Sequence, residues 1–395
     1  MEEINKTKKE IYDKLKVVKN EDKKLLALYI HIPFCEKKCN YCSFVSFCDK
    51  FNKVDEYVDC LCKELLLRKL DNYYLKSIYI GGGTPSVLSA EKIEKILSVI
   101  KTIYEISDDA EITIEVNPNS ITTEKALKYK EIGINRVSIG IQSLSDKKLK
   151  LLGRVHNRQI ALNSLQILKD VGFDNVNCDL IISLSRQTQF EINKSIKLLK
   201  KFATHFSIYS LSIEDNTQFF DMYKRGELKL PSENKSAKLY NKTCKFLQKL
   251  GYKRYEVSNF AKRGYESKHN KTYWDLNEYL GIGIASHSFI GNMRYANTED
   301  FDNYLTALSN GDLPFSCEKL SNQDLIEETI MLSLRVESGL NLEKLKANYN
   351  VDLLQTKKNE ILLLKNLGLI YVENGFLKVT DRGFLLLNQI ILKLV

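Results

Sequence analysis

Residues 29–47 read YIHIPFCEKKCNYCSFVSF, an apolar, strand-like run that leads directly into closely spaced cysteines. Cys35, Cys39 and Cys42 follow the pattern CxxxCxxC, so a single loop carries three thiol groups. A disulfide framework does not explain thiols that stand so close together in the chain. The loop is therefore expected to hold a metal centre or a redox-active thiol pair.

The number of thiols limits which metal centres this loop can hold. A structural zinc site needs a fourth Cys or His; His31 is near, but it precedes Pro33 in a strand and is expected to point away from the loop. A 4Fe–4S cluster normally takes four cysteines, so three leave one iron with an open position. Such an iron can bind a small chelating ligand, and S-adenosylmethionine (SAM), with its amino and carboxylate groups, is the first candidate. The motif favours this cluster, with zinc and a redox-active CxxC as alternatives.

Outward from this loop, apolar β-rich runs alternate with amphipathic helical patterns. Strands are predicted at 27–33, 77–81, 111–116, 136–142, 175–182 and 206–213, and helices near 53–70, 89–105, 123–132, 157–171, 189–202 and 232–250. This rhythm is typical of βα units around a parallel sheet. Polar and glycine-rich residues gather where these strands end, which is where barrel active sites are built. The expected fold class is therefore α/β, a (β/α) barrel that is partial or complete.

The remaining chain divides into further regions. Residues 1–24 form a charged N-terminal extension, 25–250 the barrel core, and 251–315 a middle region of aromatic, Gly- and His-bearing loops. Residues 316–395 read as three helices, a hairpin and a last helix, similar to a small winged-helix domain. We expect the hairpin to turn at Asn374-Gly375 and Asp381 to cap the last helix.

Composition excludes several classes of protein. The 395 residues are 44% hydrophobic and 28% charged, as in ordinary globular proteins, and the net charge of +9 is spread over helix surfaces. Nucleic acid is therefore not an expected partner. The apolar runs are shorter than the ~20 residues that a membrane span needs, and the charged start has no signal-peptide pattern. We expect a cytoplasmic protein, in which Cys60 and Cys62 only pack within a helix.

The motif YIHIPFCxxxCxYC, with GGGTP at 81–85, resembles the radical SAM superfamily. Within it, the chain is similar to the oxygen-independent coproporphyrinogen III oxidases and their heme-chaperone relatives, from Tyr29 to near the C-terminus. The resemblance implies a radical SAM barrel and a 4Fe–4S cluster held by Cys35, Cys39 and Cys42. It also implies SAM contacts at the following residues: Tyr29, Tyr41, Gly82, Gly83, Thr84, Glu115, Gln142, Arg154 and Asp179.

One stretch departs from the family pattern. After the predicted strand 175–182 the family has a turn with Gly and Pro followed by Gln-Thr, whereas this chain reads SLSRQT. Gln187 and Thr188 match, but the Gly and Pro are missing. The shape of this loop is therefore in doubt, although the fold is not.

Two features separate the chaperones from the oxidases. The oxidases carry a further Cys two residues after the motif, where this chain has Phe44. HNKTYW at 269–274 matches the chaperones' HNxxYW signature, which implies heme contacts for His269, Tyr273 and Trp274. Imidazole is a good axial heme ligand, and His287 is a second, weaker candidate. His156 and His205 are expected to be structural.

The resemblance therefore favours a heme chaperone, with no turnover reaction of its own, that binds heme and transfers it to an acceptor protein. Cluster and SAM would then control assembly or transfer. A reductant protein is a further possible partner. The alternative is an enzyme, an oxygen-independent coproporphyrinogen III oxidase that decarboxylates propionate side chains by radical SAM chemistry.

Overall fold

The computed structural model describes residues 23–395, so the expected N-terminal extension falls almost entirely outside the described residues. The centre of the fold is a curved sheet in which six strands run parallel in chain order. These strands are β1 (Lys24–Ile32), β2 (Tyr73–Gly82), β3 (Glu105–Val116), β4 (Arg136–Gln142), β5 (Val176–Ile182) and β6 (His205–Ser210).

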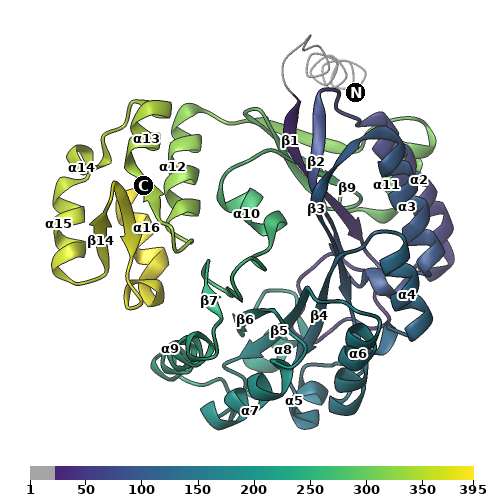
Figure 1. Ribbon diagram of the computed structural model, residues 1–395, viewed down its shortest axis with the longest axis horizontal. Helices are drawn as coiled ribbons and strands as arrows, with labels where there is room; N and C mark the ends of the chain where they lie inside the picture. Colours follow the sequence, from purple (N-terminus) through teal and green to yellow (C-terminus); the bar gives the residue numbers. More distant parts are fainter. Residues whose placement is uncertain (1–22) are drawn as a thin grey trace.

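Helices cover the outer face of this sheet (Figure 1). The helices between residues 50 and 250 are α2 (Val54–Leu67), α3 (Ala90–Ile103), α4 (Thr123–Glu131), α5 (Asp146–Leu151), α6 (Arg158–Asp170), α7 (Gln189–Leu199), α8 (Gln218–Lys224) and α9 (Glu233–Lys249). Short 3-10 turns precede some of them at Phe51–Lys53, Pro85–Val87 and Pro118–Ser120. Apolar residues at alternate strand positions, for instance Leu28, Ile80 and Ile139, are buried on the face that the helices cover. The inner face carries buried polar side chains such as Thr113 and Ser138.

The middle region is not a separate layer, because its strands extend the sheet at both edges. These strands are β7 (Lys253–Arg254), β8 (Asn259–Ala261), β9 (Tyr279–Ile282), β10 (His287–Ile290), β11 (Met293–Asn297) and β12 (Phe315–Lys319). The complete order is β12-β11-β10-β9-β1-β2-β3-β4-β5-β6-β8-β7, so the two edge strands do not pair and the barrel stays partial. The helices of this region are α10 (Lys268–Trp274) and α11 (Phe301–Ser309).

The C-terminal residues form a domain with its own hydrophobic core. Its helices are α12 (Asn322–Ser333), α13 (Leu342–Tyr349), α14 (Leu353–Thr356), α15 (Lys358–Asn366) and α16 (Leu387–Leu394), with a 3-10 turn at Gly383–Leu386. Its small sheet has the order β13-β15-β14, with β13 (Leu340–Asn341), β14 (Ile370–Glu373) and β15 (Phe376–Val379). The helices and hairpin follow one another as expected for a winged-helix-like domain. The domain begins after β12, a few residues later than the expected boundary at 316.

Two local expectations about this domain can be compared with the structure. Asn374 and Gly375 both have positive φ, 51° and 79°, which confirms the tight hairpin turn. The expected cap at Asp381 is wrong: its Oδ1 accepts a hydrogen bond of 2.7 Å from Arg254 Nη2. Asp381 thus joins the C-terminal domain to the edge of the large sheet. Among residues 23–395, no helix is both long and apolar enough to cross a bilayer.

Candidate cluster and SAM site

The cysteine loop leaves β1 and returns beside it. The backbone N–H of Cys35 donates to the carbonyl of Phe47 at 3.1 Å, and the N–H of Phe47 donates to the carbonyl of Pro33 at 2.7 Å. These two hydrogen bonds make a parallel bridge between Phe34 and Phe47. The loop between them is therefore closed at its base, and Cys39 and Cys42 lie within it.

Asn40 fastens the tip of this loop to distant parts of the chain. Its N–H donates to the carbonyl of Leu152 at 3.1 Å, its carbonyl accepts from the N–H of Phe219 at 2.7 Å, and its Nδ2 donates to the carbonyl of Leu151 at 2.9 Å. Gly153 approaches so closely that a Cβ there would lie 2.5 Å from Asn40 Oδ1. The positions of the neighbouring Cys39 and Cys42 thus depend on the segments around residues 152 and 219.

A cavity of about 460 Å³ lies between this loop and the carboxyl ends of the strands. The three cysteines line it together with every expected SAM residue except Tyr29, namely Tyr41, Gly82, Gly83, Thr84, Glu115, Gln142, Arg154 and Asp179. Tyr29 instead lies deeper in the barrel, where its ring stacks on Tyr79 at a centroid distance of 6.2 Å. The volume is within the range of small-molecule sites.

The glycine loop after β2 allows close approach of backbone to the cysteines. A Cβ on Gly83 would lie 2.8 Å from the carbonyl oxygen of Phe34 and 3.0 Å from Cys35 Sγ. Gly82 has φ +114°, a conformation that side chains disfavour. Thr84 Oγ1 lies 3.5 Å from Cys35 Sγ. The three residues therefore form a wall against Cys35 that leaves backbone groups facing the cavity.

His31 does not point away from the loop as expected. Its Nε2 lies 3.1 Å from the carbonyl oxygen of Val45, and its Nδ1 lies 3.0 Å from Tyr29 Oη. Burial lowers the pKa of His31 to about 4, so the ring is neutral and Nε2 donates to the carbonyl. The ring thus supports the returning segment of the loop. Within residues 23–395 no three His, Cys, Asp or Glu side chains are arranged to hold one metal ion.

Two carboxyl groups face the cavity from the ends of β3 and β5. Burial, and to a lesser extent nearby Asp179, raise the pKa of Glu115 to about 7, against the lowering effect of hydrogen bonds from Tyr79 and the N–H of Gly82. Burial also raises the pKa of Asp179, whose Oδ1 accepts from Asn177 Nδ2 at 2.8 Å. A ligand with a positive charge would favour the ionised forms.

Gln142 and Arg154 complete the polar wall. Gln142 has φ +59°, and its buried Oε1 has no hydrogen-bond partner. Arg154 Nη1 donates to Cys39 Sγ at 3.4 Å, and its Nη2 donates to Asn117 Oδ1 at 2.9 Å. A buried amide oxygen without a partner is costly unless a ligand donates to it. Together with the cationic group at Cys39, this oxygen makes the residues present fit a thiolate-held cluster with a polar ligand such as SAM.

The loop that departs from the family pattern still forms a turn. Ser183 and Arg186 take positive φ values of 64° and 55°, a conformation for which glycine is normally used. Gln187 Oε1 accepts from the N–H of Leu184 at 3.2 Å, and Thr188 makes a capping box with Glu191 at the start of α7. The side chains of Gln187 and Thr188 thus hold this turn without the usual Gly and Pro.

Further residues that sequence reasoning missed also line the cavity, among them Lys37, Lys38, Asn117, Ser138, Tyr209 and Glu214. Ser138 shares the alternation of β4 with Gly140 and Gln142, and Asn117 follows directly on the strand that ends at Val116. Because side chains alternate between the two faces of a strand, Ser138 could have been found on the same face as Gly140 and Gln142. Tyr209 lies on β6 itself, two positions after Ser207, whereas Glu214 reaches the cavity only through the path of the chain after β6.

The HNxxYW motif lies on α10, inside the barrel and not on a surface loop. His269 is only 1% exposed, with Nδ1 2.9 Å from Ser77 Oγ and Nε2 2.7 Å from Tyr273 Oη. Burial, and secondarily the charge of Arg136, lowers the pKa of His269 to about 3. Both ring nitrogens are therefore engaged within the protein, and the ring is neutral.

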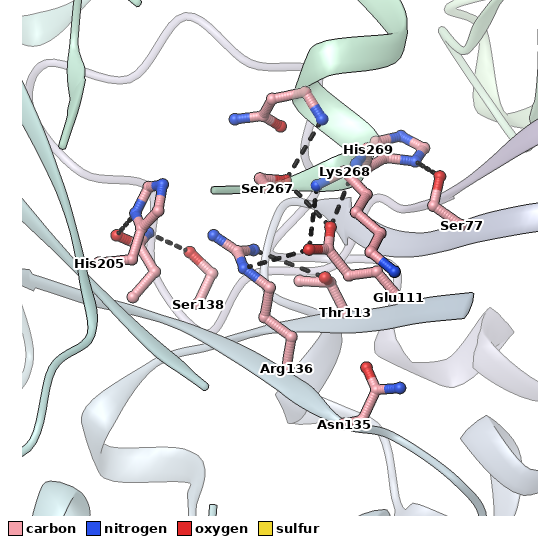
Figure 2. Close-up of polar contacts among 12 residues, drawn as sticks. Ser77, Glu111, Thr113, Asn135, Arg136, Ser138, His205, Ser267, Lys268 and His269 are labelled. Atoms are coloured by element: carbon pink, nitrogen blue, oxygen red, sulfur yellow. Dashed lines mark hydrogen bonds and ion pairs between the residues drawn. The ribbon is translucent and has the colours of Figure 1, made fainter. Parts of the chain in front are cut away.

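Glu111 holds the N-terminus of α10 (Figure 2). Its carboxylate accepts from Ser267 Oγ at 3.0 Å, from the N–H of Lys268 at 3.1 Å and from the N–H of His269 at 3.2 Å. Arg136 Nε lies 3.8 Å from Glu111 Oε2, and both side chains are buried. This buried ion pair and the cap fix α10 against the sheet.

The structure does not bring the three expected heme residues onto one surface. Trp274 faces another cavity, of about 350 Å³, whose wall includes Asp275, Lys344 and Tyr349. His287, the second candidate, is exposed at the start of β10, and among residues 23–395 its ring has no hydrogen-bond partner. His156 and His205 are buried and hydrogen-bonded, as expected of structural residues.

Comparison with known proteins agrees with this architecture. Residues 29–199 match the family described as "Radical SAM superfamily", and residues 320–386 match the "HemN C-terminal domain". A protein of Lactococcus lactis named "Heme chaperone HemW" is 37% identical over 363 residues, covering 92% of this chain and 95% of the relative. The Bacillus subtilis protein of the same name is 35% identical and covers 92% and 97%.

Among solved structures, the Escherichia coli coproporphyrinogen III oxidase HemN, titled a radical SAM enzyme, superposes with a TM-score of 0.81. It is 22% identical and covers 95% of this chain and 91% of that structure, so this likeness shows the fold alone. The identity with the two chaperones, 37% and 35%, is higher. The chain therefore belongs to the heme chaperone HemW family of the radical SAM superfamily.

Proposed function

We propose that this protein is a heme chaperone of the cytoplasm that binds heme and transfers it to an acceptor protein. The observation that carries the proposal is the 37% identity over nearly the whole chain to a relative named a heme chaperone. Phe44, at the position where the oxidases have a further cysteine, agrees with it. A reductant protein is a second partner in this proposal.

In the same proposal, Cys35, Cys39 and Cys42 hold a 4Fe–4S cluster. Arg154, 3.4 Å from Cys39 Sγ, would offset the negative charge of the thiolates. Gln142 Oε1 would accept a hydrogen bond from SAM, and Glu115 and Asp179 would face its positive groups. When bound, the cluster supplies an iron with an open position to which the amino and carboxylate groups of SAM can coordinate.

Heme is the cargo, and two histidines, His269 and His287, are the candidates for its axial ligand. For His269 to bind iron, Nε2 must first leave Tyr273 Oη, and α10 must expose the ring. His287 needs no such rearrangement because it is already exposed. The alternative to iron binding is that His269 only positions α10, since its Nδ1 forms a hydrogen bond with Ser77 Oγ on β2.

The test is an anaerobic hemin titration of the cluster-reconstituted protein, followed by visible absorbance. The variants are His269→Ala, Tyr273→Phe and His287→Ala, with His156→Ala as a matched buried-histidine control. We expect saturation near one heme per chain. If His269 is the ligand, Tyr273→Phe frees its Nε2 and tightens binding while His269→Ala weakens it; if His269 only positions α10, both variants weaken binding.

The absorbance spectrum separates these cases further, because loss of an axial imidazole shifts the heme bands whereas a displaced helix lowers affinity without that shift. Loss of the bands in His287→Ala alone would assign the ligand to the surface site. No stoichiometric uptake would contradict the chaperone proposal. SAM, a reductant and coproporphyrinogen III would then test the alternative oxidase activity by the release of carbon dioxide.

A further inference from the structure

A fourth thiol lies beside the three that line the cavity. Cys48 is exposed at the end of the cysteine loop, in the run CSFVSFC that begins with Cys42. It does not line the cavity, and the proposed cluster does not use it. Cys35, in contrast, is only 8% exposed and belongs to the proposed cluster ligands. The question is what an exposed thiol does next to a buried ligand thiol.

The backbone places Cys48 and Cys35 at neighbouring positions. Phe34 and Phe47 are partners in a parallel bridge, so the residues that follow them, Cys35 and Cys48, are adjacent across the two segments. The hydrogen bond of 3.1 Å from the N–H of Cys35 to the carbonyl of Phe47 runs between these same segments. Paired segments lie about 4.8 Å apart, and disulfides join Cα atoms that are about 4.4 to 6.8 Å apart.

Within residues 23–395 all nine cysteines are free thiols. The backbone pairing of Phe34 with Phe47 thus places a free, exposed thiol next to Cys35.

We propose that Cys48 forms a reversible disulfide with Cys35 when the loop carries no cluster. The oxidant is a small disulfide such as oxidised glutathione. The Cys48 thiolate attacks it, a bond forms between Cys48 and one glutathione sulfur, and the first glutathione thiolate leaves. The Cys35 thiolate then attacks the Cys48 sulfur and expels the second glutathione thiolate. The two protons of the cysteines end on the two glutathione thiols, so two cysteines are oxidised and one glutathione disulfide is reduced.

The disulfide would affect cluster assembly, and this consequence rests on the proposed function. The disulfide removes Cys35 from the set of three ligands, so the oxidised protein cannot take up a cluster until a thiol reduces it. It also shields the Cys35 thiol from irreversible oxidation. A bound cluster would in turn occupy Cys35 and prevent the disulfide.

The test begins with the cluster-free full chain, prepared with a chelator and incubated anaerobically with oxidised glutathione. Free thiols are alkylated, the protein is digested with trypsin without reduction, and cross-linked peptides are sequenced by mass spectrometry. Peptide 25–37 contains Cys35 and peptide 39–50 contains Cys39, Cys42 and Cys48, so fragmentation must locate the link. We expect a link from Cys35 to Cys48.

Three variants test whether the link joins Cys35 to Cys48, and together they separate loss of the link from misfolding. The double variant Cys39→Ser/Cys42→Ser retains only Cys35 and Cys48 in this loop and should form the link as the native chain does. Cys48→Ser should lose it, and Cys317→Ser, a control on the distant β12, should not change it. A link from Cys35 to Cys39 or Cys42 in the native chain, or a link that survives in Cys48→Ser, would overturn the proposal.

A second readout separates the disulfide from the proposed function. After treatment with oxidised glutathione, the native chain should bind little iron and sulfide until dithiothreitol is added, whereas Cys48→Ser should bind them without it. If the untreated chain also binds no iron and sulfide, the proposed cluster fails while the disulfide stands on the peptide data. Full iron uptake by a chain that carries the link would contradict the blocking role.

Discussion

The phenol hydroxyl of Tyr79 donates a hydrogen bond of 2.7 Å to Oε1 of Glu115. The ring of the same tyrosine stacks on His269, with centroids 5.0 Å apart. One side chain on β2 therefore contacts both a carboxyl group that faces the cavity and the histidine of α10. The cysteine cavity and the HNxxYW motif, far apart in the sequence, share a physical connection through this residue.

The raised pKa of Glu115 predicts a loss of stability as pH rises. Its pKa lies at about 7, above the ordinary value of 4.5, so between these values the folded protein holds a proton that the unfolded chain has released. The free energy of unfolding should fall over this range by about 1.4 kcal/mol per pH unit, or about 3 kcal/mol in total. Glu115→Gln should remove this part of the fall in urea unfolding curves.

Burial also raises the pKa of Glu256 to about 7, so Glu256 too makes the free energy of unfolding fall as pH rises. This second fall is the same in the native chain and in Glu115→Gln. Only the difference between the native chain and Glu115→Gln is therefore diagnostic. Parallel curves for the two proteins from pH 4.5 to 7 would show that Glu115 is ionised throughout. Glu256→Gln should remove a separate fall of similar size, which tests the same rule on a buried carboxyl group outside the cavity.

Gly83→Ala should prevent stable cluster binding. Its new Cβ would lie 2.8 Å from the backbone oxygen of Phe34 and 3.0 Å from Cys35 Sγ, and backbone cannot give way as a flexible side chain can. We expect cluster affinity to fall about tenfold or more, measured as iron and sulfide retained per chain after gel filtration. Gly226→Ala, where nothing lies within 4 Å, is the control and should retain the native amount. Equal retention in both variants would contradict the close approach at Gly83.

The buried pair Glu64–Arg68 should matter more for stability than exposed pairs. Arg68 Nη1 lies 3.0 Å from Glu64 Oε1 and also donates to the carbonyl of Gly281 at 2.9 Å, which joins α2 to β9. Arg68→Met leaves the Glu64 charge buried without its partner and should lower the free energy of unfolding by about 3–5 kcal/mol.

The exposed pair Lys53–Glu56 provides the comparison for this prediction. Glu56→Gln should change the free energy of unfolding far less than Arg68→Met does, because solvent screens exposed charges. Denaturant titration of both variants gives the two values directly. Similar losses would mean that the interior around Arg68 reorganises or admits water.

Glu111→Gln should loosen α10. The substitution removes the charge that faces Arg136 and weakens the cap that accepts from Ser267, Lys268 and His269. We expect amide hydrogen exchange in residues 267–274 to accelerate more than in the rest of the barrel. Asp109→Asn, which affects only the exposed contacts of Asp109 with Lys76, Ser107 and Lys268, is the control. Unchanged exchange in Glu111→Gln would show that contacts with β2 alone hold the helix.

The six parallel strands were predictable because apolar residues recur at every second position, as Leu26, Leu28 and Ile30 do in β1, and are buried against the helices. Strand β3 starts at Glu105, earlier than expected, because its first residues are partly exposed and polar and pair with Tyr74 and Leu75 of β2. The short strands β7 to β12 left no periodic signal. β9 is held by pairing with the distant β1, and β8 by pairing with the distant β6, and such pairing cannot be seen locally. β10 and β11, in contrast, form a local hairpin.

The cysteines and the polar residues at strand ends could be located because the carboxyl ends of parallel strands share one edge of a barrel. The surroundings of His269 could not. Its burial depends on Ser77, which is 192 positions earlier, and on the cap from Glu111. A seven-residue helix has too few turns for an amphipathic pattern, so α10 looked like a loop. Trp274 then faces the other way, toward the C-terminal domain.

The attachment of Asn40 sets an order of events during synthesis. The segment that carries all three thiols is made within the first 42 residues, yet its tip is fastened by the carbonyl of Leu152 and the N–H of Phe219. A nascent chain shorter than this would present the thiols on an unanchored segment. Completion of the loop geometry around these thiols is therefore a late step, after the ribosome has released residue 219.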